Sequence, residues 1–189
     1  QREPEIPGIA QDQDMTVRAA RLLSQASGCG LGADIRLDKR LPLGGGLGGG
    51  SSNAATTLVA LNRLWNLGLT RDELATLGLR LGADVPVFIH GHASFAEGVG
   101  EKLSDLELPE PWFLVLTPPV EVDTREIFEA RELKRDSPRL TVRQYRAGSA
   151  TRNDCEPVTC ARYPQVGEAL ERLRRFAPAR MSGTGSSVF

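Results

Sequence analysis

The sequence lacks an excess of either charge. Its 189 residues include 23 Lys and Arg and 24 Asp and Glu, for a formal net charge of −1. Binding to nucleic acid or to an anionic membrane usually needs a basic excess or cluster, so we expect neither partner. The sequence also lacks an apolar run long enough to span a membrane, and no charged segment followed by an apolar one opens it. We therefore expect a soluble, globular protein.

Cysteine is scarce as well. Cys29, Cys155 and Cys160 are an odd number without CxxC spacing, which indicates free thiols in a reducing compartment and predicts a cytoplasmic protein. Cys155 has no general base near it in the sequence, which favours a packed side chain over a nucleophile.

Apolar residues at helical spacing predict several helices. The clearest pattern joins Ala54, Leu58, Leu61 and Trp65, for which Ser51 and Ser52 are candidate N-caps. Thr70 and Glu73 form a capping box, flanked by Leu69 and Leu74 in the positions of a hydrophobic staple. The predicted helices are 16–26, the segment after residue 50, 70 to about 81, and 166–176.

Other segments predict strands, turns and loops. Alternation over 33–37 predicts a half-buried strand, and the continuous apolar run 112–116 predicts a buried strand that opens a second unit. Pro86 removes a backbone donor, which favours a specially shaped turn over a helix or strand. The polar, aperiodic segment 131–152 predicts a loop or a poorly ordered insertion.

The most informative segment is the glycine-rich run 44–50. Six glycines allow positive φ angles and a close approach of the backbone to a ligand, so successive N–H groups can converge on an anion. The helix that follows adds unpaired N–H groups and the positive end of its dipole. This combination predicts a phosphate-binding loop that needs no basic side chain.

Three other interpretations of this segment fit less well. A flexible linker has polar, aperiodic flanks, whereas this loop leads directly into a periodic helix. Gly44, Gly46 and Gly49 match the dinucleotide spacing, but a strand does not directly precede them, and the acids about twenty residues on, Asp72 and Glu73, lie at a helix start. A P-loop needs a lysine before its serine, and none stands there.

Four segments carry a specific resemblance to a known family. Residues 42–55, PLGGGLGGGSSNAA, resemble the ATP loop of the GHMP kinase superfamily without a gap. Within that superfamily, LGADVPVF at 81–88 and FAEGVGE at 95–101 resemble the branch that phosphorylates a cytidine diphosphate-linked methylerythritol. The closing MSGTG of 181–185 resembles the third, glycine-rich motif of the same branch.

The resemblance implies an α+β fold of two domains, a part like ribosomal protein S5 domain 2 followed by a partial ferredoxin-like part. It places an ATP-binding N-terminal domain at 1–105, without its first strands, and a partial C-terminal domain at 106–189. The branch also has an N-terminal Lys-Leu-Asn motif, whereas the three lysines here, Lys39, Lys102 and Lys134, lie in other contexts. With its polar first fourteen residues, the chain is therefore expected to be truncated at both ends.

The resemblance also assigns roles to individual residues. Asp84 stands at the position of the proposed catalytic base, which accepts or orients the proton of the acceptor hydroxyl. Its neighbours Ala83 and Val85 are apolar, so a helix-capping or buried structural aspartate is the alternative. Mg²⁺ is expected to accompany ATP, with its ligands left open. The residues assigned to ATP are Pro42, Gly44, Gly45, Gly46, Leu47, Gly48, Gly49, Gly50, Ser51, Ser52 and Asn53.

The residues assigned to the substrate are Thr124, Phe128, Gly183 and Thr184. The phenyl ring of Phe128 can stack on a cytosine, or it can be a core residue of a short helix. Asp14 and Met15 differ from the Asn-Leu pair that contacts adenine in relatives.

Lys39 and the two histidines have simpler interpretations. Lys39 can reach phosphates or be part of a solvated strand end. His90 and His92 have no third ligand near them, so they are expected to be surface or packing histidines.

The predicted function is ATP-dependent phosphorylation of the 2-hydroxyl of that cytidine-linked substrate, in isoprenoid precursor synthesis by the non-mevalonate route. The oligomeric state is left open. Two alternatives remain: a non-catalytic nucleotide-binding fragment, and a GHMP kinase for another alcohol such as homoserine or mevalonate. A dinucleotide-dependent oxidoreductase is a more distant one.

Overall fold

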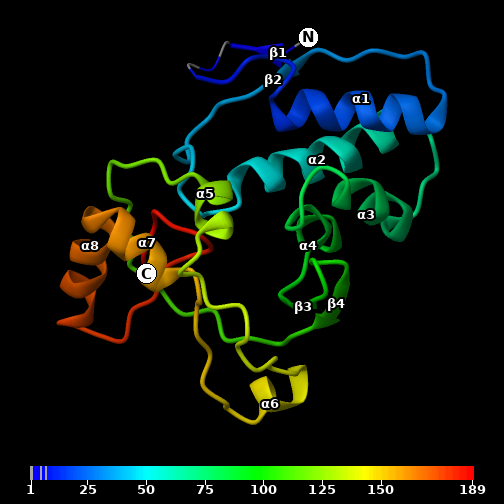
Figure 1. Ribbon diagram of the computed structural model, residues 1–189. Coiled ribbons are helices and arrows are strands. Elements are labelled where there is room, and N and C mark those ends of the chain that lie inside the picture. The colour runs from blue at the N-terminus through cyan, green and yellow to red at the C-terminus, as the bar shows by residue number, and fades with distance from the viewer. Residues whose placement is uncertain (1, 5, 7) are drawn as a thin grey trace. The chain divides into compact units, whose positions relative to one another are not determined.

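A computed structural model describes residues 2–4, 6 and 8–189 of the chain, which divide into two compact units. The first contains the residues up to Arg40 together with Gly48–Pro109, and the second contains Leu41–Leu47 and Glu110–Phe189. Figure 1 shows the elements of each unit. Residues 1, 5 and 7 of the polar opening stretch, which also belong to the predicted N-terminal domain, lie outside the described residues.

The first unit is built on packed helices. Helices α1, α2, α3 and α4 enclose a core that includes Leu23, Leu58, Leu74, Val85 and Ile89. Two small sheets complete the unit: β1 pairs with β2 in parallel, and β3 pairs with β4 in antiparallel register, with Phe95 opposite Ser104. The elements are β1 (Arg2–Glu3), α1 (Met15–Ser27), β2 (Ile35–Arg36), α2 (Gly49–Leu64), α3 (Arg71–Leu79), α4 (Val85–His90), β3 (Ser94–Glu97) and β4 (Lys102–Asp105).

The predicted first helix and first strand are confirmed. Helix α1 begins after Asp14, whose buried carboxylate accepts a hydrogen bond from the backbone N–H of Thr16, and ends at Gly28 with φ 66°. Ile35 and Leu37 are half-buried and Arg36 is exposed, which is the alternation predicted for 33–37.

Two predicted helix starts have different outcomes. The capping box of α3 is present in full, with the Thr70 hydroxyl accepting from Glu73 N and the Glu73 carboxylate accepting from Thr70 N. At α2 the prediction of Ser51 or Ser52 as N-cap is wrong, because the N-cap is Gly48. Its left-handed φ of 66° turns the chain into the helix, which begins at Gly49, so both serines lie in the first turn.

Replacing Thr70 by Ala is expected to lower the free energy of unfolding by about 1 kcal/mol, because α3 loses its side-chain cap. Urea unfolding measures the difference. Thr76→Ala is the matched control: its hydroxyl donates to Asp72 O from an exposed position within the same helix, so the expected change is below about 0.5 kcal/mol. Equal losses in the two variants would contradict a specific role of the cap.

The same cap has a pH dependence. The hydrogen bonds from Thr70 lower the pKa of Glu73 below its usual value of 4.5. A lowered folded-state pKa contributes stability that is complete above the usual pKa and is lost as the pH falls through the folded value. The difference in the free energy of unfolding between wild type and Thr70→Ala is therefore expected to become smaller below about pH 4.5.

The predicted interruption at Pro86 is wrong. Pro86 lies in the first turn of α4, where a backbone N–H has no partner within the helix, so the missing donor costs nothing. Val85, Pro86 and Ile89 are buried, and Gly91 ends the helix with φ 80°.

The second unit has four short helices around its own core, which includes Ile127, Val158, Val166, Leu170 and Val188. The helices are α5 (Thr124–Glu129), α6 (Val142–Arg146), α7 (Glu156–Arg162) and α8 (Pro164–Arg174). Helix α8 confirms a helix in the predicted region 166–176, although it begins at Pro164 and ends at Arg174, which leaves Phe176 exposed beyond it. Within the predicted loop 131–152, α6 forms a single capped helix of five residues, with Thr141 and Gln144 as its capping box.

The prediction of a buried strand at 112–116 is wrong. Trp112, Phe113, Leu114 and Val115 are exposed, and only Leu116 pairs, in an isolated bridge with Val188. A continuous apolar run is buried only where other elements cover it, and these four side chains remain exposed even though the Phe113 ring makes a T-shaped contact with the Phe189 ring.

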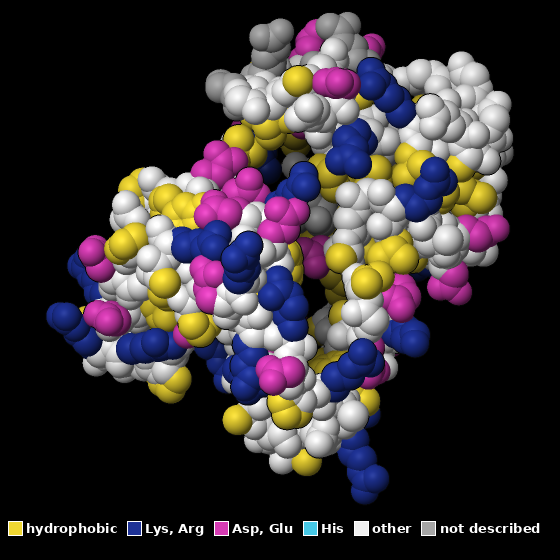
Figure 2. Space-filling model, in the orientation of Figure 1, with side chains coloured by type: hydrophobic (Ala, Val, Ile, Leu, Met, Phe, Trp, Pro, Cys, Tyr) yellow, Lys and Arg dark blue, Asp and Glu magenta, His cyan; other side chains and the backbone are white. Residues whose placement is uncertain are grey.

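The surface of the protein is mixed in charge. Figure 2 shows Lys and Arg side chains interspersed with Asp and Glu on the face that it draws, as the balanced composition predicts. No helix in the described part of the chain has the length and apolar character that crossing a membrane requires.

Candidate functional site

The second unit brings residues 44–46 of the glycine-rich loop against a second glycine-rich stretch, residues 182–187, called the closing segment below. Gly44 O accepts a hydrogen bond from Ser186 N at 3.2 Å, and Gly45 O accepts one from Ser187 N at 3.1 Å. The Ser182 hydroxyl donates to Gly46 O at 2.7 Å. Two motifs far apart in the sequence therefore form one local structure.

Glycine is required at position 46 of this structure. Gly46 has φ 68°, a left-handed conformation that L side chains rarely adopt. A Cβ atom there would lie 2.4 Å from Ser182 O and 2.6 Å from Gly185 O. Both neighbours are backbone carbonyls, so any larger residue would force the two segments apart.

Hydroxyl groups of neighbouring threonines form hydrogen bonds with the closing segment. Ser187 is fully buried and its hydroxyl lies 2.9 Å from Thr117 Oγ1. Thr184 is also buried: its hydroxyl lies 3.0 Å from Thr124 Oγ1, and its carbonyl accepts from Thr159 Oγ1 at 3.0 Å. The structure thus joins Thr124 and Thr184, which the sequence assigned separately to substrate binding.

Gly183 lies at the exposed tip of this closing segment. Its φ is 57°, and its carbonyl accepts a hydrogen bond from Asn153 Nδ2 at 2.7 Å. The same amide nitrogen donates to Met181 O at 3.1 Å, so the Asn153 side chain forms hydrogen bonds with two carbonyls of this turn. Sequence reasoning missed Asn153, because a single asparagine in a polar stretch carries no signal of a contact 30 residues away.

Replacing Ser182 by Ala is expected to lower the free energy of unfolding by about 0.5–1.5 kcal/mol, because Gly46 O loses its hydroxyl donor. Urea unfolding of the chain measures it. Ser149→Ala is the matched control, since Ser149 is exposed in the same unit and its hydroxyl makes no hydrogen bond within the part that the structure describes. A Ser182 variant as stable as the Ser149 variant would show that the contact does not hold the loop.

The first unit contains the second half of the loop and the start of α2. No side chain in the described part of the chain caps this helix, and the first backbone bond runs from Ser52 N to Gly48 O at 2.8 Å. The N–H groups of Gly49, Gly50 and Ser51 therefore have no capping acceptor, at the positive end of a helix of 16 residues. This terminus can bind an anion.

The turn that contains Asp84 lies beside this helix terminus. A Cβ atom on Gly82 would lie 4.0 Å from the Ser51 hydroxyl oxygen. A Cβ atom on Gly100 would lie 2.3 Å from Ala83 O, so the segment after β3 also packs on this turn. The first unit thus gathers the 81–88 and 95–101 motifs around Asp84, near the start of α2.

Asp84 has neither of the roles offered as alternatives. It occupies the N-cap position of α4 but makes no side-chain capping bond, and it is exposed although Val85 and Pro86 are buried. The expectation of an apolar setting for its carboxylate is therefore wrong, because α4 turns those neighbours inward and leaves Asp84 in solvent. Its carboxylate has no hydrogen bond or ion pair to the residues that the structure describes, so it is available to a ligand.

Thr124 and Phe128 both lie on α5. Phe128 is 56% exposed, and Ile127 is the buried residue of this helix, so the alternative that Phe128 is a core residue is wrong. Positions four apart lie on the same side of a helix, which places the phenyl ring one turn beyond the Thr124 hydroxyl.

Three of the remaining candidates, His90, Cys155 and Asp14, make structural contacts, whereas the two interpretations of Lys39 stay open. His90 Nε2 lies 2.5 Å from Asp105 Oδ1, and this bond lowers the pKa of Asp105. Cys155 is packed in the core, where burial raises the pKa of its thiol. Asp14 caps α1, and Lys39 follows β2 between Asp38 and Arg40, which pair with each other at 2.9 Å.

The fold and the loop define a class of protein. The sequence profile described as "GHMP kinases N terminal domain" matches residues 14–92, a range that holds the whole glycine-rich loop, α2 and the Asp84 turn. The chain is also similar to a solved structure described as "Crystal structure of 4-(cytidine 5'-diphospho)-2C-methyl-D-erythritol kinase". That match covers all of this chain and 71% of the other, with 32% identity and a TM-score of 0.76. The α+β, GHMP-kinase-like fold is confirmed.

Curated relatives narrow the class further. The proteins named 4-diphosphocytidyl-2-C-methyl-D-erythritol kinase of Aromatoleum aromaticum and Alkalilimnicola ehrlichii are 58% and 64% identical over 100% and 96% of this chain. That of Thiobacillus denitrificans is 57% identical over 100%. This chain belongs to the 4-diphosphocytidyl-2-C-methyl-D-erythritol kinase family. It spans 66%, 62% and 67% of the three relatives' lengths, respectively.

Proposed function

We propose that the protein to which this chain belongs transfers the γ-phosphate of ATP to the 2-hydroxyl of 4-diphosphocytidyl-2-C-methyl-D-erythritol, a step in isoprenoid precursor synthesis by the non-mevalonate route. One observation carries the kinase part of this proposal: the uncapped start of α2 directly follows a glycine-rich loop whose conformation only glycine permits. The names of the relatives and of the similar solved protein support the choice of substrate.

The loop is proposed to bind the phosphates of ATP through its backbone. The N–H groups of Gly49, Gly50 and Ser51 can donate to phosphate oxygens, and the helix dipole favours their negative charge. The assigned residues Pro42 and Gly44 to Asn53 supply the rest of the backbone around the phosphates. Residues 1–105 are proposed to form the ATP-binding domain and 106–189 part of the second domain.

The residues near the start of α2 fit Mg²⁺. This ion usually binds one or two carboxylates together with substrate phosphates and water, and the described residues contain no group of three or more His, Cys, Asp or Glu side chains that could hold a metal by themselves. The free carboxylate of Asp84 and the nearby hydroxyl of Ser51 are of the right donor type. When bound, Mg²⁺ neutralises charge that develops on the transferred phosphoryl group.

Asp84 is proposed to accept or orient the proton of the 2-hydroxyl. Phosphoryl transfer depends mainly on positioning and charge stabilisation, with a carboxylate to direct the nucleophile. On the second unit, Thr124, Phe128, Gly183 and Thr184 are proposed to bind the substrate, with the exposed ring of Phe128 stacking on the cytosine.

Steady-state kinetics of the full-length gene product with Mg²⁺ and ATP test this function. The acceptors to compare are 4-diphosphocytidyl-2-C-methyl-D-erythritol, homoserine and mevalonate. The proposal expects kcat/KM for the cytidine-linked alcohol to exceed the other two by at least about 1,000-fold, because a site that hydrogen-bonds the cytidine diphosphate part leaves those groups unpaired with a smaller acceptor. Preference for homoserine or mevalonate, or ATP binding without turnover of any acceptor, would refute it.

A further inference from the structure

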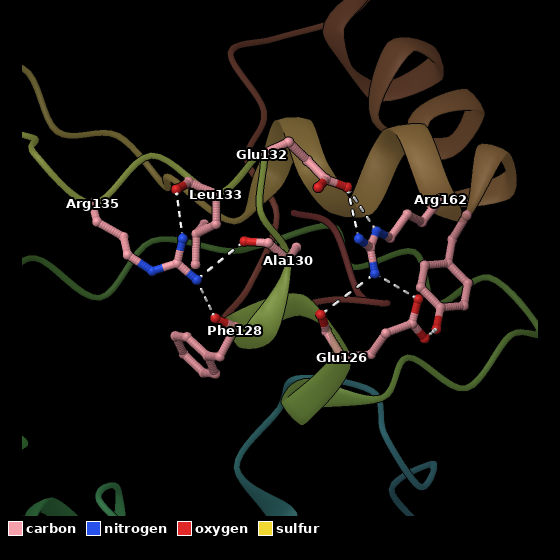
Figure 3. A network of polar contacts seen from close by, with 8 residues as sticks. Glu126, Phe128, Ala130, Glu132, Leu133, Arg135 and Arg162 are labelled. Carbon is pink, nitrogen blue, oxygen red and sulfur yellow. Dashed lines mark hydrogen bonds and ion pairs between the residues drawn. The ribbon is translucent and has the colours of Figure 1, made fainter.

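Helix α5 carries two proposed substrate residues but is too short to hold its own conformation. It has six residues, Thr124–Glu129, and isolated helices of this length are unstable in water. Its only buried residue is Ile127. The geometry of Thr124 and Phe128 therefore depends on groups outside the helix, and Figure 3 shows two arginines on either side of it.

Arg162, at the end of α7, holds one side of α5. Its guanidinium pairs with Glu126 Oε1 at 2.8 Å and, through two nitrogens, with Glu132 Oε1 at 2.7 and 3.0 Å. The neighbouring Tyr163 hydroxyl donates to Glu126 Oε2 at 2.9 Å, so both carboxylate oxygens of Glu126 are occupied from the end of α7. Glu126 lies midway between Thr124 and Phe128.

Arg162 and Tyr163 keep their protons near neutral pH. Hydrogen bonds to Glu132 and Glu126 raise the pKa of Arg162, and the bond to Glu126 raises the pKa of the Tyr163 hydroxyl. Both side chains therefore remain donors over the physiological range.

Arg135 holds the other end of α5. It donates to Phe128 O at 2.6 Å, Ala130 O at 3.1 Å and Leu133 O at 3.0 Å. These carbonyls lie at or just beyond the helix C-terminus, where a cation is favourable. The contact reaches the backbone of Phe128 itself, while its ring remains exposed (Figure 3).

We propose that Arg162 and Arg135 are positioning residues that fix α5 so that Thr124 and Phe128 meet the nucleotide end of the substrate. The proposal rests on the function proposed above. Neither arginine is assigned to substrate or ATP, so each acts through α5. A helix held in its binding conformation lowers the cost of substrate binding. Small displacements of the groups that position the substrate can therefore weaken its binding strongly.

The test compares Arg162→Gln, Arg162→Lys and Arg125→Gln in the full-length gene product. Arg125 is the matched control, since it is an arginine of α5 itself but, among the residues that the structure describes, pairs only with Glu129 on the exposed surface. Arg162→Gln is expected to raise KM for the cytidine-linked substrate about tenfold or more, with kcat and KM for ATP within about twofold. Lysine can pair with one carboxylate, whereas arginine reaches two. KM for the cytidine-linked substrate in Arg162→Lys is therefore expected to lie between those of wild type and Arg162→Gln.

Several outcomes would overturn the proposal. One is a KM for the cytidine-linked substrate that is no higher in Arg162→Gln than in Arg125→Gln. Another is a lower kcat and a rise in both KM values together with a lower melting temperature, which would indicate that Arg162 supports only the fold. Should Arg162→Gln fail to fold, Tyr163→Phe decides, with an expected rise of about threefold in the same KM and none in KM for ATP. A wild-type protein inactive on the cytidine-linked alcohol refutes the proposed function and this proposal together, whereas an active one with unaffected variants refutes this proposal alone.

Discussion

Asp84→Asn is expected to lower kcat by about 100-fold or more in the full-length protein, while the affinity for ATP measured without Mg²⁺ changes less than about threefold. Asparagine keeps the size of the side chain but cannot accept the proton of the substrate hydroxyl. Because Asp84 is exposed and its side chain caps no helix, its replacement should leave the melting temperature unchanged. The loss would then be chemical in origin.

Asp38→Asn is the matched control for this prediction. It removes an exposed carboxylate of the same unit whose one ion-pair partner in the described part of the chain is Arg40, so kcat should stay within about twofold of wild type. Full activity of Asp84→Asn would show that another group directs the hydroxyl. An inactive wild type that still binds ATP would instead favour a nucleotide-binding protein without catalysis.

Gly46→Ala is expected to weaken ATP binding about tenfold or more and to destabilise the chain by about 2 kcal/mol or more. The methyl group would meet Ser182 O and Gly185 O at 2.4 and 2.6 Å, and the left-handed backbone adds strain. The loop would have to separate from the closing segment, which would displace the N–H groups that follow it. Isothermal titration with ATP and urea unfolding measure the two effects.

Gly167→Ala is the control for Gly46→Ala. Gly167 lies in helix α8 of the same unit, has no positive φ, and its added methyl would meet Cys160 Cβ at an ordinary 3.5 Å. It is expected to leave ATP binding unchanged and to stabilise the chain slightly, by up to about 1 kcal/mol. If Gly46→Ala bound ATP as tightly as Gly167→Ala, the loop would not be the phosphate site.

Local sequence signals predicted the parts of the fold that local chemistry determines. The Thr70 and Glu73 capping box and the alternation around Ile35 each involve residues close in the sequence. Two further local signals indicate helix starts in the second unit. They are the capping box of Thr141 and Gln144 at α6, and Pro157 in the first turn of α7. Both are ordinary helix start signals.

Features that depend on distant segments could not be predicted in this way. The bond from Ser182 to Gly46 joins positions 136 apart, so both glycine-rich motifs could be recognised in the sequence but their pairing could not. Exposure of Trp112 and of Asp84 likewise depends on what packs around them, and apolar neighbours in the sequence predicted burial for both. The contact of Arg162 with Glu126 has no local signal at all.

The most direct measurement follows the transferred phosphate itself. The full-length protein is incubated with Mg²⁺, γ-labelled ATP and 4-diphosphocytidyl-2-C-methyl-D-erythritol, and phosphorus NMR with mass spectrometry locates the label. We predict one new phosphomonoester, on the 2-hydroxyl, formed in equal amount to ADP. Release of the label only as inorganic phosphate, or its attachment to a different hydroxyl, would contradict the proposed reaction.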